Sequence, residues 1–215
     1  MSSFRQDFIR FAVNQKVLCF GEFKTKASRI SPYFFNAGLF NDGASLRNLS
    51  QFYAQAILTS GIQFDMLFGP AYKAIPLAAG TAIALAEQGR NVPYCYNRKE
   101  IKDHGEGGIT VGAKLQGKVL IIDDVISAGT SIRESVELIR TAGAEPCGVV
   151  IALDRMERGE SAFSATQEVQ RNYAIPVVSI ATLSDLLVYL QDNVEMLQNL
   201  NAVQSYIDRY GVKND

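Results

Sequence analysis

The segment VLIIDDVISAGTS at residues 119–131 constrains this chain more than any other. Its four large apolar residues lead directly into two acids, Asp123 and Asp124. A continuous apolar run bounded by polar turn residues is typical of a buried parallel strand. The turn that follows carries hydroxyls and a glycine, and a helical pattern begins at Ile132. The segment therefore predicts a strand, a turn and a helix of an α/β fold.

The same segment is suited to holding a phosphorylated ribose. Hydroxyls, backbone N–H groups and a helix N-terminus converge at the turn, and together they can bind a phosphate. The two acids would repel a phosphate, so we expect them to accept hydrogen bonds from ribose hydroxyls or to face a hydrated Mg²⁺. They lie at the carboxyl end of the strand, where ligands bind in open α/β sheets. The alternative is a buried strand with a polar exit and a capped helix.

Length and charge exclude several classes of protein. A chain of 215 residues with 47% hydrophobic content fits one domain, or one domain with an elaboration. The net charge of −1 gives no general basic field for nucleic acid. The first fifteen residues are interrupted by charges, which excludes a signal peptide or membrane span there. Three separated cysteines and one histidine argue against a disulfide framework or a structural zinc site, so we expect a reduced, cytoplasmic protein.

From Phe64 onward, predicted strands alternate with helices of 10 to 15 residues, which indicates βαβ units and a parallel sheet. Residues 1–62 do not fit this alternation, and we expect them to cap a core formed by residues 63–215. The predicted strands are 17–23, 64–68, 92–96, 119–122, 147–153 and 177–180. The predicted helices begin around residue 4 and then cover 43–61, 75–88, 132–143, 160–172 and 183–190, with a last one ending near Tyr210. Residues 98–112 lack periodicity, and within them residues 98–108 predict a loop.

Two further segments carry positive charge. The turn from Gly69 to Lys73 follows a predicted strand, so its backbone and lysine could meet a diphosphate; the alternative is an ordinary turn with a surface lysine. The loop 98–108 combines Arg98, Lys99 and Lys102 with the single histidine, His104, and three glycines. Such a loop can close over a polyanionic ligand. The alternative is a solvated basic loop.

Aromatic residues and one arginine are the candidates for binding a planar, charged acceptor. The aromatics at 33–35 could form a flat wall against a ring, or they could be core packing. Arg155 follows a predicted strand and could make a bidentate pair with a carboxylate. The alternative is that Arg155 forms a structural salt bridge with Asp154 or Glu157.

These segments carry a family resemblance. VLIIDDVISAGTS resembles the phosphoribosyl pyrophosphate (PRPP) motif of the type I phosphoribosyltransferases. The remaining segments, which cover essentially the whole chain, together resemble the bacterial orotate phosphoribosyltransferases: GEF near the N-terminus, SPYFFNAG, FGPAYK at 68–73, NRKEIKDHGEGG at 97–108 and LDRMERG at 153–159. The resemblance implies a Rossmann-like parallel sheet flanked by helices, with an N-terminal hood. It implies transfer of ribose 5-phosphate from PRPP to orotate, giving orotidine 5′-monophosphate and diphosphate in pyrimidine (UMP) biosynthesis.

The resemblance also implies roles for particular residues. The expected PRPP-binding residues are Lys26, Tyr72, Lys73, Arg98, Lys99, Lys102, His104, Asp123, Asp124, Val125, Ile126, Ser127, Ala128, Gly129, Thr130 and Ser131. The expected orotate-binding residues are Phe34, Phe35, Ser127 and Arg155. Lys73, Lys102, His104 and Asp124 are expected to be catalytic. Mg²⁺ is expected to arrive with PRPP near the two acids, without direct protein ligands. The implied enzyme is a homodimer whose loop 98–108 contributes to the neighbouring site.

The sequence departs from the family pattern in one turn. The family usually has Lys-Ser-Gly-Arg before the aromatic segment, whereas this chain has Lys26-Ala27-Ser28-Arg29. Serine in place of glycine removes easy access to positive φ, so we expect the turn after Lys26 to differ. Ser127 stands where threonine is common in the family and keeps the hydroxyl.

The implied chemistry needs no covalent nucleophile. The sequence has no Ser/His/Asp or Cys/His constellation, so catalysis by positioning and electrostatics is expected. One alternative is a phosphoribosyltransferase with a purine acceptor, which the aromatic segment and Arg155 disfavour. Another is a non-catalytic PRPP-sensing regulator or nucleic-acid-binding protein, which would not need the cationic loop and would usually carry a basic segment.

Overall fold

The computed structural model describes residues 4–25, 28–102, 108–159 and 161–212. Its centre is a six-stranded sheet with the order β5-β4-β3-β6-β7-β8. The strands are β3 Met66–Gly69, β4 Tyr94–Lys102, β5 Gly108–Gly112, β6 Lys118–Ile122, β7 Glu145–Asp154 and β8 Val177–Thr182. Every pairing is parallel except that of β4 with β5. The predicted α/β fold with a mostly parallel sheet is confirmed.

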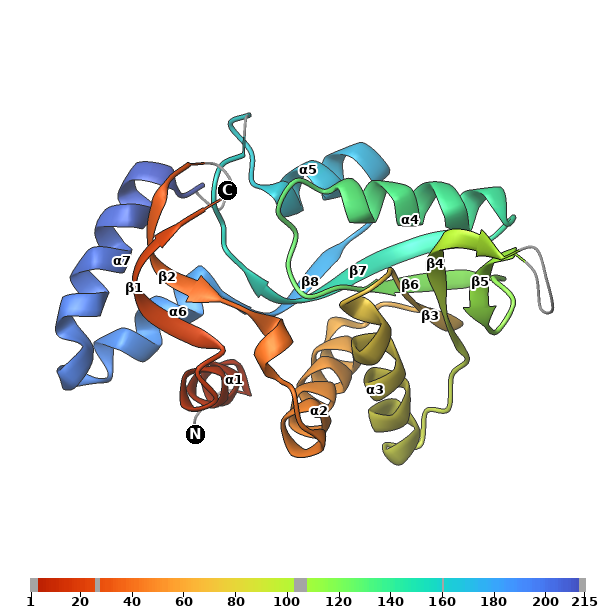
Figure 1. The fold of residues 1–215 in the computed structure, drawn as a ribbon, viewed down its shortest axis with the longest axis horizontal. Coiled ribbons are helices and arrows are strands. Elements are labelled where there is room, and N and C mark those ends of the chain that lie inside the picture. The colour runs from red at the N-terminus through yellow and green to blue at the C-terminus, as the bar shows by residue number, and fades with distance from the viewer. Residues whose placement is uncertain (1–3, 26–27, 103–107, 160, 213–215) are drawn as a thin grey trace.

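The central strands are buried on both faces, as their continuous apolar sequences predict. Along β6, Leu120 faces one hydrophobic cluster and Ile121 faces the other. The first cluster lies under α2 (Gly43–Ser60) and α3 (Ala74–Glu87), and the second lies under α4 (Thr130–Thr141) and α5 (Ala165–Tyr173). Figure 1 shows these helix pairs on opposite sides of the sheet. This double cover leaves the carboxyl ends of the strands as the place where loops can form a site.

Capping residues determine several helix boundaries. Asp42 caps α2 by accepting hydrogen bonds from the Ala44 and Ser45 N–H groups, and Gly61 ends the helix at φ 73°. A capping box between Thr182 and Asp185 begins α6 (Leu183–Gln191), as predicted. By contrast, α5 begins at Ala165 rather than near residue 160, because Ser164 is its N-cap.

A second, smaller lobe lies beside the sheet. It contains α1 (Phe4–Asn14) and a two-stranded antiparallel sheet of β1 (Leu18–Lys24) and β2 (Ile30–Phe35). Two 3₁₀ turns, Ala37–Leu39 and Val194–Met196, and the last helix, α7 (Leu197–Tyr210), complete the described elements. Figure 1 shows α6 and α7 next to the β1–β2 hairpin, and α7 packs on β2. The N-terminal hairpin and the C-terminal helices are therefore joined in one lobe, whereas α2 lies on the main sheet.

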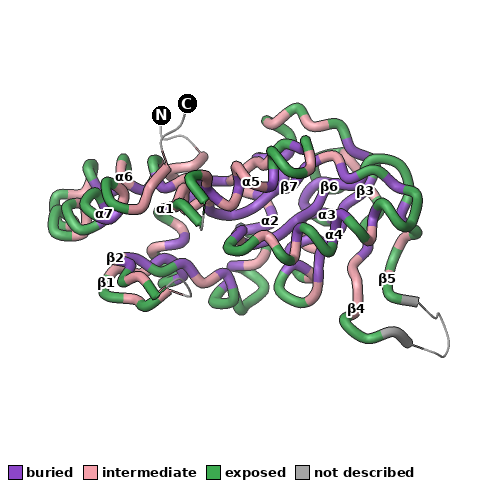
Figure 2. The backbone as a smooth tube through the Cα atoms, turned by 90° about the horizontal axis from the view of Figure 1, so that it is seen from above, coloured by how far each residue is buried: buried purple, intermediate pink, exposed green. Residues whose placement is uncertain are grey.

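The prediction that residues 98–108 form a loop is wrong at both described ends of the segment. There β4 continues to Lys102 and pairs with β5, through Tyr96 with Val111 and Asn97 with Thr110. Figure 2 shows this hairpin extending away from the body of the molecule. A projecting ribbon has no face against the core, so its sequence lacks the alternation that reveals a strand.

Among the described residues, no helix is long and apolar enough to cross a membrane.

Candidate active site

Two adjacent buried carboxylates lie at the carboxyl end of β6. Asp123 and Asp124 are each only 7% exposed. The Asp124 N–H donates to Asp123 Oδ1 at 2.9 Å, and the Val125 N–H donates to Asp124 Oδ1 at 2.9 Å. Burial and the neighbouring Asp124 charge raise the pKa of Asp123 to about 7, partly opposed by hydrogen bonds from the Asp124 backbone and Ser131. Burial and the neighbouring charge therefore favour the protonated form of the Asp123 carboxyl.

A tyrosine of α2 holds the backbone of this pair in place. The Tyr53 hydroxyl donates to the Asp123 carbonyl at 2.7 Å, and both groups are buried. The Asp123 N–H donates to the Val150 carbonyl and the Ala152 N–H to the Asp124 carbonyl, so the acids are also fixed to β7. Tyr53 was not among the predicted site residues, because a tyrosine within the apolar stripe of a helix looks like an ordinary core residue.

The turn after β3 meets the acids through a lysine. Lys73 Nζ lies 3.3 Å from Asp124 Oδ2. Gly69 precedes this turn, and a Cβ there would lie 2.5 Å from the Ala74 carbonyl oxygen, so only glycine fits this close approach. The Ala71 N–H donates to Asn97 Oδ1 at 2.7 Å, and the Ala71–Tyr72 peptide bond is cis. The turn is thus fastened both to the end of β6 and to β4.

Strand β4 brings two further cations to this edge. Lys99 Nζ lies 5.2 Å from the centroid of the Tyr72 ring, and Tyr72 is 62% exposed. Arg98 has a buried Nη1 atom without a hydrogen-bond partner among the described residues. The side chains of Lys26, Lys102 and His104 lie outside what the structure describes, so their predicted roles stay predictions.

The turn after the acids presents polar groups at the start of α4. Ile126 is buried and Val125 is half-buried, whereas Ser127, Ala128 and Thr130 are exposed. Gly129 has φ 69° and directly precedes the helix. The turn is therefore anchored by its apolar residues, and its hydroxyls and backbone face the helix N-terminus where an anion can bind.

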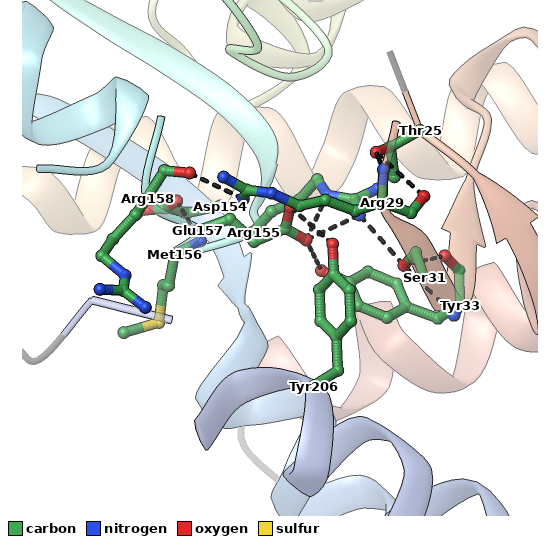
Figure 3. A network of polar contacts seen from close by, with 10 residues as sticks. All are labelled: Thr25, Arg29, Ser31, Tyr33, Asp154, Arg155, Met156, Glu157, Arg158 and Tyr206. Atoms are coloured by element: carbon green, nitrogen blue, oxygen red, sulfur yellow. Dashed lines mark hydrogen bonds and ion pairs between the residues drawn. The ribbon is translucent and has the colours of Figure 1, made fainter. Parts of the chain in front are cut away.

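Arg155, at the end of β7, is held in a network of polar side chains (Figure 3). Its Nε and Nη2 atoms donate to Glu157 Oε1 at 2.9 and 2.7 Å, and Nη2 also donates to Ser31 Oγ at 3.2 Å. Its guanidinium carbon lies 4.6 Å from the centroid of the Tyr33 ring. The salt bridge foreseen as an alternative is present with Glu157. Asp154 instead accepts from the Met156 N–H and the Thr166 hydroxyl.

The electrostatics of Arg155 follow from this network. Burial acts to lower the pKa of Arg155, but Tyr33 and Glu157 outweigh it, and the pKa is raised. Burial also raises the pKa of Tyr33 well above its usual value, so this hydroxyl stays a donor. Tyr33 and Tyr206 donate to the two oxygens of Glu157 at 3.0 and 3.1 Å.

The aromatic residues at 33–35 do not lie side by side as one flat wall. These residues belong to β2, and successive side chains of a strand point to opposite faces. Tyr33 and Phe35 are buried, with Phe35 packed near Phe8, whereas Phe34 is 44% exposed and stacks on Phe23 with ring centroids 5.4 Å apart. Only Phe34 presents its ring at the surface, and the binding roles foreseen for Phe34 and Phe35 stay predictions.

The turn between β1 and β2 keeps a left-handed residue despite lacking glycine. Ser28, which stands at the family's glycine position, has φ 59°. Arg29 next to it donates from Nη1 to the Arg158 carbonyl at 2.8 Å, which ties this turn to the segment after β7. Ser28 therefore adopts the left-handed conformation that glycine adopts easily, although it carries a side chain.

Sheet topology places these features at one edge. β3, β6 and β7 are parallel neighbours, so the turns at Lys73, Asp124 and Arg155 follow the same ends of adjacent strands. Among the described residues, no group of three or more His, Cys, Asp or Glu side chains could hold a metal ion. Two carboxylates fit Mg²⁺ only where the substrate and waters supply its other ligands.

Comparison with known proteins gives consistent results. The family described as "Phosphoribosyl transferase domain" matches residues 38–170. The chain is 70% identical over 212 residues to an orotate phosphoribosyltransferase of Chromobacterium violaceum, covering 99% of both chains. It is 66% identical to one of Laribacter hongkongensis, covering 99% of this chain and 100% of that one. A crystal structure of orotate phosphoribosyltransferase from Francisella tularensis matches with a TM-score of 0.87 and 42% identity, covering 95% of this chain and 99% of that one.

Proposed function

This chain belongs to the orotate phosphoribosyltransferase family, and from that premise we propose that the strand-end residues form one site for ribose 5-phosphate transfer from PRPP to orotate. The observation that carries the proposal is the arrangement at the ends of β3, β6 and β7. Buried paired acids, an exposed hydroxyl turn at a helix N-terminus and a fixed arginine follow adjacent parallel strands. The reaction yields orotidine 5′-monophosphate and diphosphate and belongs to pyrimidine biosynthesis. A purine acceptor is not favoured, because the relatives at 64–70% identity are all named for orotate.

The donor half of the site consists of the acids and the groups around them. Asp123 and Asp124 accept hydrogen bonds from the ribose hydroxyls, and the turn 125–131 holds the 5-phosphate at the N-terminus of α4. Tyr72, Lys73, Arg98 and Lys99 surround the diphosphate. The contacts of Lys73 with Asp124 and of Lys99 with Tyr72 support this grouping. Lys26, Lys102 and His104 complete the donor site in this proposal.

The acceptor half of the site consists of Arg155, Ser127, Phe34 and Phe35. Arg155 supplies a positive charge for the carboxylate of orotate. Three of its five N–H groups are used by protein acceptors, so the donors left for a ligand are on Nη1. Exposed Phe34 offers a ring surface, whereas the Phe35 side chain lies in the core on the opposite face of β2, so its part in the acceptor site is limited to its backbone.

The chemical step is a displacement at C1′ of the ribose. A bond forms from the orotate ring nitrogen to C1′ as the C–O bond to diphosphate breaks; the bonding electrons leave with diphosphate, and the proton of the ring nitrogen is released to solvent. Positive charge grows on the sugar and negative charge on the leaving group. Lys73, Lys102 and His104 stabilise the leaving group, and Asp124 faces the sugar. When bound with PRPP, Mg²⁺ would neutralise part of the diphosphate charge near Asp123 and Asp124.

The assembly and location of the enzyme are also part of this proposal. The far end of the β4–β5 hairpin projects from the body of the molecule and suits a contribution of the loop 98–108 to the site of a second subunit in a homodimer (Figure 2). A cytoplasmic location agrees with three free thiols, at Cys19, Cys95 and Cys147.

The test of the proposed function is orotate loss measured by absorbance with PRPP and Mg²⁺. We expect turnover with orotate and none with adenine, guanine or hypoxanthine. Arg155→Ala should raise the KM for orotate more than the KM for PRPP, because the arginine meets only the acceptor. An equal rise in the KM values for orotate and PRPP would instead indicate a structural role for Arg155. Absence of turnover in the unaltered protein would refute the proposed function.

A mixing experiment tests the shared site. A Lys102→Ala variant and an Asp124→Asn variant are each expected to be weakly active alone. If the hairpin of one subunit serves the neighbour, mixed dimers will contain one site with both native residues, and activity will partly recover. Mixing each variant with itself is the control. A mixture that stays at the level of the separate variants would mean that each chain forms a complete site.

A further inference from the structure

Glu157 accepts an unusual number of hydrogen bonds for one carboxylate. Its Oε1 receives donors from Arg155 Nε, Arg155 Nη2 and the Tyr33 hydroxyl, and its Oε2 receives the Tyr206 hydroxyl. The four distances lie between 2.7 and 3.1 Å, and the Glu157 side chain is 15% exposed. Figure 3 shows both tyrosines and the arginine converging on it. If any of these donors adopted another orientation, Glu157 would lose one of its hydrogen bonds.

The consequence for Arg155 is a single orientation. Glu157 occupies the edge of the guanidinium formed by Nε and Nη2, Ser31 Oγ takes a further Nη2 donor, and the Tyr33 ring lies against the plane at 4.6 Å. A guanidinium has five N–H donors, so the two that remain are those of Nη1. Among the described residues, the hydrogen bonds of the guanidinium come from Nε and Nη2 and none comes from Nη1, while the Tyr206 hydroxyl also interacts with the guanidinium. The contacts therefore select which edge of the arginine can meet a ligand.

The contacts to Glu157 come from three distant parts of the chain. Tyr33 lies on β2, Arg155 follows β7, and Tyr206 lies on α7. Met156 and Arg158, on either side of Glu157, pair through their backbones with Val212 and Tyr210. The carboxylate is thus fixed from both the N-terminal hairpin and the C-terminal helix, and its own position does not depend on a bound substrate.

We propose that Glu157, oriented by Tyr33 and Tyr206, is a positioning residue that sets the Nη1 edge of Arg155 toward the carboxylate of the acceptor and so makes the enzyme selective for a carboxylated pyrimidine. The inference rests on the proposed function, in which Arg155 meets that carboxylate. A simple structural role would be different: Glu157 would only clamp α7 to the lobe, and its loss would affect both substrates alike.

The first experiment compares Glu157→Ala with the unaltered enzyme in steady-state kinetics. We expect the KM for orotate to rise about 10- to 100-fold, the range for losing hydrogen bonds to a charged group, with the KM for PRPP unchanged. Selectivity for orotate over uracil, which lacks the carboxylate, should fall by a similar factor. A rise of both KM values, or a lower KM for orotate, would overturn the proposal.

A double-mutant cycle separates positioning from clamping. Because Glu157 acts through Arg155, adding Glu157→Ala to Arg155→Ala should change the KM for orotate by less than about 3-fold, far less than in the native background. Equal effects in the two backgrounds would show that Glu157 acts independently of the arginine, and the inference would fail.

Conservative variants keep the test valid if the alanine variant does not fold. Glu157→Gln retains an acceptor oxygen for the arginine and should keep most of the selectivity for orotate over uracil. Tyr206→Phe removes one donor from Glu157 and should lower that selectivity less than Glu157→Ala. A Glu157→Gln enzyme with no remaining selectivity, or a Tyr206→Phe enzyme more damaged in PRPP use than in orotate use, would contradict the proposal.

Asp154→Asn is the matched control. Asp154 is a neighbouring carboxylate whose partners are Met156 and Thr166, not Arg155. Its substitution should leave the ratio of orotate to uracil use unchanged, and an equal loss of selectivity would refute the specific role of Glu157. The two proposals can fail separately: an inactive unaltered protein refutes the proposed function, whereas an active protein with unselective damage refutes only the role of Glu157.

Discussion

Replacing Asp123 with asparagine tests the main electrostatic feature of the donor site. Two carboxylates stand next to each other with 7% exposure each, and burial with the neighbouring charge raises the pKa of Asp123 from 3.8 to about 7. In the unfolded chain the same group titrates near its ordinary value. Between these two pH values the folded protein therefore holds a proton that the unfolded chain has released.

The sign and size of the effect follow from linkage. The stabilisation from the retained proton is fully present below about pH 3.8 and is lost as the pH rises through about 7. A pKa unit corresponds to about 1.36 kcal/mol, so the shift corresponds to ~4 kcal/mol in all. Because part of that lies below pH 5, the free energy of unfolding should fall by about 2 to 3 kcal/mol between pH 5 and pH 8 through this group.

The assay is urea denaturation of both proteins, without ligand, at about pH 5 and pH 8. Asparagine cannot ionise, so the unfolding free energy of Asp123→Asn should not include the fall that Asp123 causes between about pH 5 and pH 8. Relative to the native protein, the variant should therefore gain about 2 to 3 kcal/mol in unfolding free energy at the higher pH. Asp65→Asn, at a surface carboxylate away from the site, is a suitable control. Parallel pH profiles for the native protein and Asp123→Asn would refute the raised pKa.

Lys102→Ala should lower kcat by ~10²–10³ with little change in the KM for PRPP, because a preorganised cation acts on the leaving group; a near-normal kcat removes it from catalysis. Ser28→Gly should raise the unfolding free energy by ~0.5 kcal/mol, since a left-handed φ of 59° strains serine by ~1–2 kcal/mol and glycine entropy offsets part of this. Ala174→Gly, at a residue with φ 56°, should raise the unfolding free energy by a similar amount, and destabilisation at both positions would contradict the strain argument. Tyr53→Phe removes the 2.7 Å bond to the Asp123 carbonyl and should lower the unfolding free energy by ~1 kcal/mol and weaken PRPP binding in titration calorimetry; unchanged binding would separate Tyr53 from the site.

Local sequence patterns were sufficient to predict the elements that bury apolar residues or carry caps. The four apolar residues before Asp123 gave a strand buried on both faces, and the prediction of the helix between Asp42 and Gly61 is confirmed. The start of β4 was predicted, and it carries the buried Cys95, but the continuation of β4 to Lys102 and the pairing strand β5 were missed, because the projecting part leaves no apolar period in the sequence.

The sequence did not predict the parts of the site that depend on contacts between residues far apart in the chain. The acids and Lys73 follow strands, so the rule that ligands bind at strand ends located them. Glu157 appeared only as one possible salt-bridge partner of Arg155. Its tyrosine partners lie 124 and 49 residues away, and no local pattern indicates that a strand near the N-terminus and a helix near the C-terminus meet there.

The lobe that joins the β1–β2 hairpin to α7 has a consequence for protein synthesis. The sheet strands and paired acids are translated before Tyr206, which is needed to complete the surroundings of Arg155. In the proposed function, the described residues of the donor half are therefore all synthesised before Tyr206, whereas the acceptor half also depends on α7. A polypeptide released just before α7 would retain the proposed donor residues but lack the tyrosine that fixes Arg155 through Glu157. The two halves of the proposed site are thus completed at different points of translation.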